Sequence, residues 1–351
     1  MTTRTRYFVI VSLLVLGVGL GTGLVAYYVG FPARADGGAG GPKELAYVPR
    51  DASVIAFANV QEIMSSELRQ KLRRAVPIPE NGQQELQDRT GINLETDVDR
   101  VVACARPDAG SSNVPGAGMV LARGRFDEVK IEALMREHGA QVEDYNGKRL
   151  IVADGTNDVT VGDQARHVSG SFALSFVEPG LAALGTTALI KSAIDLHQTG
   201  NNPKSGLESV TGNDELMKRV RSMDDGNAWV VGRFDALRSQ AHLPENVASQ
   251  IPAITWFAVK SHINGGISGV VSADARDDEA ANNLRKVVDG FLALAKLQSG
   301  SRPELQTMMQ SLALGGTGRT VSLSFTVPIE VFDLIGAFGG GRMPKKQPQA
   351  H

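Results

Sequence analysis

A long uncharged segment near the N-terminus restricts the possible folds of this chain more than any other feature. No charged side chain occurs between Tyr7 and Ala33. About 20 mostly apolar residues are enough to cross the hydrocarbon core of a bilayer as a helix. Aromatic residues lie at both ends of the segment, as expected at two lipid–water interfaces. We therefore expect a transmembrane anchor over residues 7–31, with the lipid bilayer as its partner.

The flanking residues indicate an orientation and leave one alternative open. Arg4 and Arg6 precede the apolar segment, and a long C-terminal body is translocated largely regardless of its charge. We expect a single-pass protein of the inner membrane, with a cytoplasmic tail and an extracytoplasmic body. The alternative is cleavage after Ala35, because Ala33-Arg34-Ala35 has the small-x-small form of a signal-peptidase site.

Composition excludes several classes of function for the body of the protein. The hydrophobic content of 42% is sufficient for packed cores, and the formal net charge of −2 gives no electrostatic basis for nucleic-acid binding. Cys104 is the only cysteine, which excludes an intrachain disulfide and a C-x-x-C redox or zinc site. Cys104 lies in an apolar, strand-like run, so a buried hydrophobe is favoured over a nucleophile.

Turn residues predict that the sheets are mainly antiparallel. Asn146-Gly147 and Asn264-Gly265 each separate two strand-like segments, and Asn-Gly is a strong hairpin signal because both residues accept positive φ. Pro179-Gly180 is expected to form a third such turn. Short carboxylates at Asp127 and Asp277 are suited to begin helices as N-caps.

A strand followed by a helix recurs along the body, and the segments Asp51–Val60 and Asp225–Phe234 are similar in character. The second half is predicted to have the β-α-β-β-α-β order of a ferredoxin-like unit, and the first half begins in the same way. The sequence therefore predicts an α+β fold: an N-terminal transmembrane helix, then two tandem ferredoxin-like domains with mainly antiparallel sheets. The expected boundaries are 1–6 tail, 7–31 anchor, 32–44 Gly-rich linker, 45–200 first domain, 201–212 linker, 213–338 second domain and 339–351 disordered tail.

The segment that opens the first domain carries a family resemblance. Val48-Pro49-Arg50-Asp51-Ala52 lies between the predicted anchor and an apolar strand. In this respect residues 45–65 resemble a group of exported, membrane-anchored bacterial proteins of unknown function. The resemblance implies an extracytoplasmic body and no particular reaction.

The sequence predicts no catalytic residue, no cofactor-binding residue and no metal ligand. No pair of histidines has the i, i+4 spacing of a helical metal site; they are His138, His167, His197, His242, His262 and His351. The cluster Asp154, Asn157 and Asp158 does not match the calcium-loop pattern and is expected to form Asx turns. Gly315-Gly316-Thr317-Gly318 precedes a strand rather than a helix, so we expect a turn and not a phosphate cradle.

Two further patterns each permit a structural and a functional interpretation. Ser322, Ser324 and Thr326 form a hydroxyl row on the last strand, which is typical of the wet face of an antiparallel sheet but also suits a ligand groove. Trp229 and Trp256 occupy strand positions where core packing is favoured over a carbohydrate platform.

The sequence favours a non-catalytic role in binding or assembly over catalysis. An exported hydrolase, with a site assembled from distant residues, and a cleaved, soluble periplasmic carrier remain as alternatives. Any ligand site is expected between the two halves, since domain junctions are preferred pocket locations. The protein or small-molecule ligand is not specified by any motif.

Overall fold

The computed structural model describes residues 41–75, 91–106, 117–161, 164–200, 206–223, 225–234, 253–298 and 303–332. Its strands are β1 (Val54–Asn59), β2 (Val98–Arg106), β3 (Ala117–Gly124), β4 (Gln141–Tyr145), β5 (Lys148–Val161), β6 (Gln164–Glu178), β7 (Leu181–Thr186), β8 (Ala228–Arg233), β9 (Ile254–Ile263), β10 (Gly266–Ala275), β11 (Ala313–Gly315) and β12 (Thr320–Pro328). Its helices are η1 (Lys43–Tyr47), α2 (Val60–Met64), α3 (Glu67–Ala75), α5 (Leu94–Asp97), α6 (Glu128–Glu137), α7 (Thr187–Thr199), η3 (Val210–Gly212), α8 (Asp214–Arg221), α11 (Asp278–Gln298) and α12 (Pro303–Ser311).

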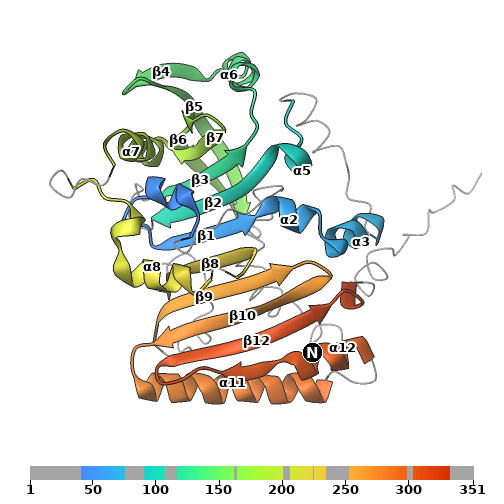
Figure 1. The fold of residues 1–351 in the computed structure, drawn as a ribbon. Coiled ribbons are helices and arrows are strands. Elements are labelled where there is room, and N and C mark those ends of the chain that lie inside the picture. Colours follow the sequence, from blue (N-terminus) through green and yellow to red (C-terminus); the bar gives the residue numbers. More distant parts are fainter. Residues whose placement is uncertain are drawn as a thin grey trace, which may run out of the picture.

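The strands of the described chain form one continuous sheet (Figure 1). Their order is β11-β12-β10-β9-β8-β1-β2-β3-β7-β6-β5-β4. Each pair of neighbours in this order is antiparallel. The first and second halves of the chain therefore share a single sheet, joined where β1 pairs with β8.

The prediction of two tandem ferredoxin-like domains is therefore wrong. In a split β-α-β unit another strand of the sheet lies between the two strands that the helix connects. Here, strands that follow one another along the chain lie side by side instead, as β1-β2-β3 and β8-β9-β10, and both halves contribute to one sheet. Several strands of the second half, among them β8, β9, β10 and β12, lie where the sequence predicts strands, but their positions along the chain do not determine which strand lies beside which. β1 and β8 are apolar on both faces, so each is stabilised in the middle of a sheet rather than at an edge.

The register of β1 and β8 explains the similarity between Asp51–Val60 and Asp225–Phe234. Ile55 pairs with Val231, Ala56 with Val230, and Phe57 with Trp229. When Asp51–Val60 is aligned with Asp225–Phe234 from the first residue of each, Ile55 corresponds to Trp229 and Phe57 to Val231. Exchanging the two strands therefore leaves the residue pairs between β1 and β8 at the same positions. The similarity thus describes an approximate two-fold relation within one sheet, centred on the pair Ala56–Val230.

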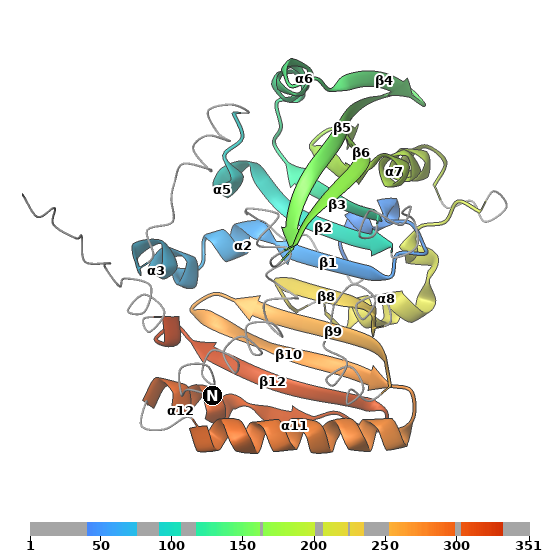
Figure 2. The same cartoon turned by 180° about the vertical axis from the view of Figure 1, so that it is seen from behind.

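Helices cover the two faces of the sheet unevenly (Figures 1 and 2). η1, α7 and α8 pack on one face around a core that includes Ile55, Met119 and Trp229. The opposite face packs against α2 and α6 in the first half, and against α11 and α12 at the β10–β12 end. Among the described residues, no helix combines the length and apolar character needed to cross a bilayer.

The local predictions about turns and caps are confirmed. Asn146 and Gly147 have φ values of 51° and 69° between β4 and β5, and Gly180 has φ 73° between β6 and β7. Asn264-Gly265 joins β9 to β10 as predicted, but neither residue has the positive φ on which that prediction was based. The side chain of Asp127 accepts a hydrogen bond from Lys130 N at 3.0 Å, and that of Asp277 accepts one from Ala280 N at 2.8 Å.

Two segments differ from expectation, and three predicted segments lie outside the described residues. Residues 154–161 belong to β5 and residues 164–171 to β6, so Asp154, Asn157 and Asp158 lie on a strand rather than in a loop. The second part of the expected linker is packed, with Ser209 and Val210 buried. The predicted anchor, the C-terminal tail 339–351 and the first helix of the predicted ferredoxin-like order in the second half, expected over residues 235–250, lie outside the described residues.

Candidate functional site

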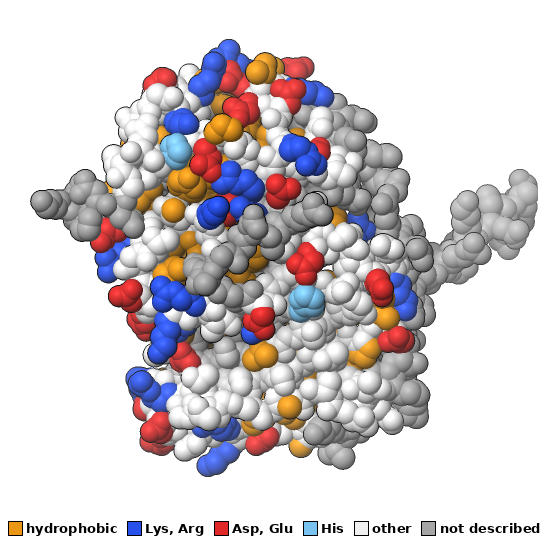
Figure 3. Space-filling model, viewed as in Figure 1, with side chains coloured by type: hydrophobic (Ala, Val, Ile, Leu, Met, Phe, Trp, Pro, Cys, Tyr) orange, Lys and Arg blue, Asp and Glu red, His pale blue; other side chains and the backbone are white. Residues whose placement is uncertain are grey.

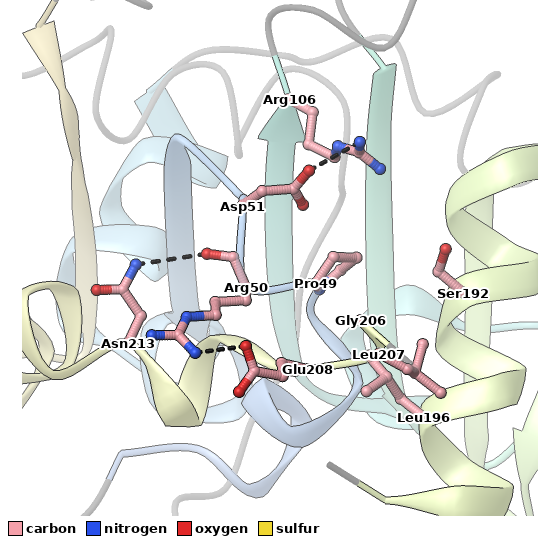
Figure 4. Close-up of a pocket in the computed structure, with 10 residues that line it drawn as sticks. All are labelled: Pro49, Arg50, Asp51, Arg106, Ser192, Leu196, Gly206, Leu207, Glu208 and Asn213. Carbon is pink, nitrogen blue, oxygen red and sulfur yellow. Dashed lines mark hydrogen bonds and ion pairs between the residues drawn. The ribbon is translucent and has the colours of Figure 1, made fainter. Parts of the chain in front are cut away.

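A cavity of about 520 Å³ lies where the connector between the two halves crosses the start of β1 (Figure 4). Its walls come from the segment before β1, the end of β2, α7 and the connector before α8. The lining residues are Pro49, Arg50, Asp51, Arg106, Ser192, Leu196, Gly206, Leu207, Glu208 and Asn213. Its size falls within the range of small-molecule sites.

Backbone pairing between two distant segments holds one wall of this cavity. Arg50 N donates to Glu208 O at 2.9 Å, and Val210 N donates to Val48 O at 2.8 Å. Pro49 and Ser209 form an isolated antiparallel bridge between these bonds. The connector is therefore fixed against the Val48–Asp51 segment, which places Glu208 beside Arg50.

Four charged side chains in the cavity form two ion pairs (Figure 4). Arg106 Nη2 lies 2.8 Å from Asp51 Oδ2, and Arg50 pairs with Glu208. The Asn213 amide donates to Arg50 O at 3.4 Å and ties this wall to the start of α8. A guanidinium has five N–H donors, and each of these pairs uses only part of that capacity. Pro49, Leu196 and Leu207 supply apolar surface.

A second charged network lies inside the first half, on η1 and the neighbouring strands. Glu44 is 0% exposed and accepts hydrogen bonds from Arg100 Nε at 3.1 Å and from Arg123 Nε at 2.9 Å. Arg123 also pairs with Glu178, which accepts a hydrogen bond from Tyr47 Oη at 3.0 Å. A buried carboxylate is tolerated because two guanidinium groups compensate its charge.

This network shifts the pKa values of its members. Burial and the hydrogen bond to Glu178 raise the pKa of Tyr47 to about 12. Burial alone would raise the pKa of Glu178, but hydrogen bonds from Arg123 and Tyr47 outweigh it and hold that pKa below the usual value. Burial opposes the charged form of Arg123, yet its bonds to Glu178 and Glu44 raise its pKa overall. These shifts favour a neutral Tyr47, an ionised Glu178 and a charged Arg123, which are the forms that make the hydrogen bonds of this network.

Comparison with protein-family models, characterised proteins and solved structures gave no match. The arrangement of side chains is therefore the only basis for assigning a function. Within the described ranges, no three His, Cys, Asp or Glu side chains converge in a way that would hold a metal ion.

Cys104, His138 and His197 occupy structural positions, whereas His242 and His351 lie outside the described residues. Cys104 is buried, and burial raises the pKa of its thiol to about 12, so it is not a reactive nucleophile. His138 caps the C-terminus of α6 and His197 lies in the last turn of α7. Gly315 ends β11, and Gly316–Gly318 lies in the turn between β11 and β12, where a turn was predicted.

The hydroxyl row lies on the face of β12 opposite α11 and α12. Ser322 faces Ser272 and Thr326 faces Ser268 on β10. The hydroxyl of Ser272 donates to the carbonyl of Ala258, and that of Ser324 to the carbonyl of Ala313. This half-exposed surface over β9, β10 and β12 carries few charged side chains (Figure 3).

The two tryptophans differ in their surroundings. Trp229 is buried between the halves and stacks on Phe57 with 5.5 Å between ring centroids. Trp256 donates to Glu215 at 2.8 Å, and the Arg219 guanidinium lies 4.3 Å from its ring centroid. Because Arg219 covers one face of the Trp256 ring, this ring is not arranged as an open carbohydrate platform.

The sequence predicts that any ligand site lies between the two halves, but it does not identify the residues of such a site. Arg50 and Asp51 were noted only as part of the segment that opens the first domain. Arg106 and Glu208 were not singled out, because nothing local to either residue shows its partner. The Val48–Asp51 segment was the one signal that marked this region.

Proposed function

We propose that this chain is a membrane-anchored, extracytoplasmic binding protein whose cavity holds a small zwitterion such as an amino acid or a short peptide. The observation that carries the proposal is the presence of two arginines and two carboxylates around one cavity of about 520 Å³. A zwitterion matches this set, because its carboxylate bonds a guanidinium and its ammonium bonds a carboxylate.

The pairing geometry supports exchange with a ligand. Asp51 has a side chain that is 59% exposed, so its bond to Arg106 is accessible to a competing carboxylate. The apolar residues of the wall then contact the side chain of the ligand. In this arrangement Arg106 and Asp51 bind the two charged groups, while Arg50 and Glu208 keep the connector in place.

The cavity favours binding over the alternative of hydrolysis. The Ser192 hydroxyl donates to the Ala188 carbonyl at 3.1 Å, within its own helix. A nucleophilic serine requires a neighbouring general base, and the described lining residues include no histidine. The extracytoplasmic placement rests on the apolar segment 7–31 alone, and retention in the membrane after alkaline washing tests it.

Titration calorimetry with free amino acids and dipeptides tests the binding proposal on the full-length protein. We expect saturable binding to the wild type and a loss of roughly tenfold or more for Arg106→Gln, since a charge-assisted hydrogen bond is removed. Asp51→Asn should weaken the binding of zwitterions more than the binding of simple carboxylates. Arg276→Gln is the matched control, because Arg276 also pairs with a neighbouring aspartate, Asp277, at 3.1 Å, outside the cavity.

Two results would contradict the proposal. One is the absence of binding by any amino acid, dipeptide or small carboxylate. The other is equal binding by the wild type and Arg106→Gln, which would place the ligand elsewhere.

A further inference from the structure

α11 has a second apolar stripe on which no other described element packs. The inward side of the helix packs on the sheet through residues that include Ala281, Leu284 and Leu292. On another side, Val287, Phe291 and Leu294 are exposed at 40%, 61% and 53%. A helix with apolar residues beyond its buried face is typical of an element that packs against a further partner.

The spacing of this stripe is symmetric along the helix. Val287, Gly290, Phe291 and Leu294 follow the i, i+3, i+4, i+7 pattern, so they lie on one side of α11. A two-fold axis between Gly290 and Phe291 sets Val287 opposite Leu294 of a second copy. The same axis sets Phe291 opposite the partner's Gly290, above which there is open space. In each copy, therefore, the large side chain of Phe291 faces the small Gly290 of the other copy.

We propose that this face of α11 is a homodimer interface in which α11 packs antiparallel against α11 of a second copy. A self-complementary patch of this kind is what an isologous two-fold interface requires. The antiparallel arrangement also places the positive N-terminal end of each helix dipole beside the negative C-terminal end of the other. The stripe itself contains no charged residue, so no unpaired charge is buried.

The position of α11 leaves room for a partner. Figures 1 and 2 both place α11 along the β11–β12 end of the sheet, away from the cavity and the connector. The three exposed side chains offer roughly 250 Å² per copy, given about 150–250 Å² for a large side chain. That is about a third of the roughly 800 Å² per partner of a standard interface. The dimer is therefore weak in dilute solution and is favoured by confinement in a membrane, a step that rests on the proposed anchoring.

Cysteine cross-linking of the full-length chain tests both the partner and the register, in membrane vesicles and in concentrated detergent solution. A mixture of Val287→Cys and Leu294→Cys protomers should form disulfide dimers, whereas each variant alone should not. Gly290→Cys should cross-link to itself because it lies beside the two-fold axis. Val129→Cys on α6 is the control, as Val129 is 81% exposed outside the stripe. Cys104 is only 6% exposed and gives no background.

Any of three other outcomes of the cross-linking experiment would overturn the proposal. Cross-linking no greater than that of Val129→Cys would show that no second copy occupies the stripe. Equal cross-linking of Val287→Cys alone and of the mixture would exclude the antiparallel register. Shielding of the introduced thiols by lipid vesicles without cross-linking would assign the stripe to the bilayer instead. Arg106→Gln should leave the cross-links unchanged, so failure of the binding proposal is distinguishable from failure of this one.

Discussion

The buried charges of the first half show how single residues depend on their partners. Glu44 has no exposed surface and is held by Arg100 and Arg123, while Glu178 and Tyr47 extend the network toward solvent. Removing one partner of a buried pair costs about 3–5 kcal/mol, because the other charge is left uncompensated. The network therefore fixes η1 against β2 and β3, and through η1 it positions the segment that lines the cavity.

The lowered pKa of Glu178 predicts a specific loss of stability in acid. The unfolded chain takes up a proton at the usual glutamate pKa of about 4.3, whereas the folded protein does so at lower pH. The stabilisation is thus complete above that value and is lost as the pH falls through the folded pKa. Glu178→Gln should be less stable than the wild type by about 1 kcal/mol at pH 7.

Urea unfolding at neutral and acidic pH measures this difference. The difference in free energy of unfolding between wild type and Glu178→Gln should disappear as the pH falls well below about 4, because the wild-type carboxyl is then also uncharged. Glu137→Gln, at an exposed position on α6, should match the wild type throughout. A difference in free energy of unfolding that stays constant across the pH range would show that the charge of Glu178 does not cause the loss of stability.

At the scale of elements, strands approach one another closely where glycine is present. Gly185 on β7 lies opposite Met119 on β3. A Cβ at position 185 would lie 2.3 Å from the carbonyl oxygen of Gly118, a backbone atom that cannot move without distorting the sheet. The tight pairing of β3 with β7 therefore requires glycine at this position.

Gly185→Ala should lower the free energy of unfolding by roughly 2 kcal/mol or more, because the new methyl group overlaps the neighbouring strand. Gly212→Ala is the matched control, since nothing lies within 4 Å of a Cβ there. That control should be neutral or slightly stabilising, as alanine restricts the unfolded chain. Thermal unfolding followed by circular dichroism compares the two, and equal midpoints would contradict the close approach.

At the scale of the whole molecule, the β1–β8 pairing joins both halves into one sheet. Phe57 and Trp229 stack across this junction, and the main core includes residues from both halves. Neither half can unfold without exposing apolar surface on the other. We therefore expect the protein to unfold as a single cooperative unit.

Hydrogen exchange in denaturant tests this cooperativity by comparing amides of β3 and β10. Both should exchange with the same free energy of opening, and Phe57→Ala should lower both by about 3–5 kcal/mol because it leaves a cavity at the junction. Val129→Ala, at an exposed position on α6, should lower neither. A loss confined to β3 would show that the halves are independent domains.

The sequence alone determined the features that depend on a few neighbouring residues. The Asn146-Gly147 turn and the caps at Asp127 and Asp277 follow from local φ preferences and local hydrogen bonds, and all three were predicted correctly. The lengths of β5 and β6 were underestimated, because residues 154–171 are mostly polar and the apolar alternation by which strands are recognised is confined to a short stretch at Val159 and Val161.

Only the tertiary structure decided how these elements meet. The pairing of β1 with β8, the burial of Glu44 and the proximity of Arg50 to Glu208 each join residues far apart in the chain. Such contacts depend on which apolar faces exclude water together and on which buried charges find partners, and neither is a property of a short segment. Several strands, turns and caps were therefore recognisable in the sequence, whereas the single sheet and its cavity arise from long-range packing.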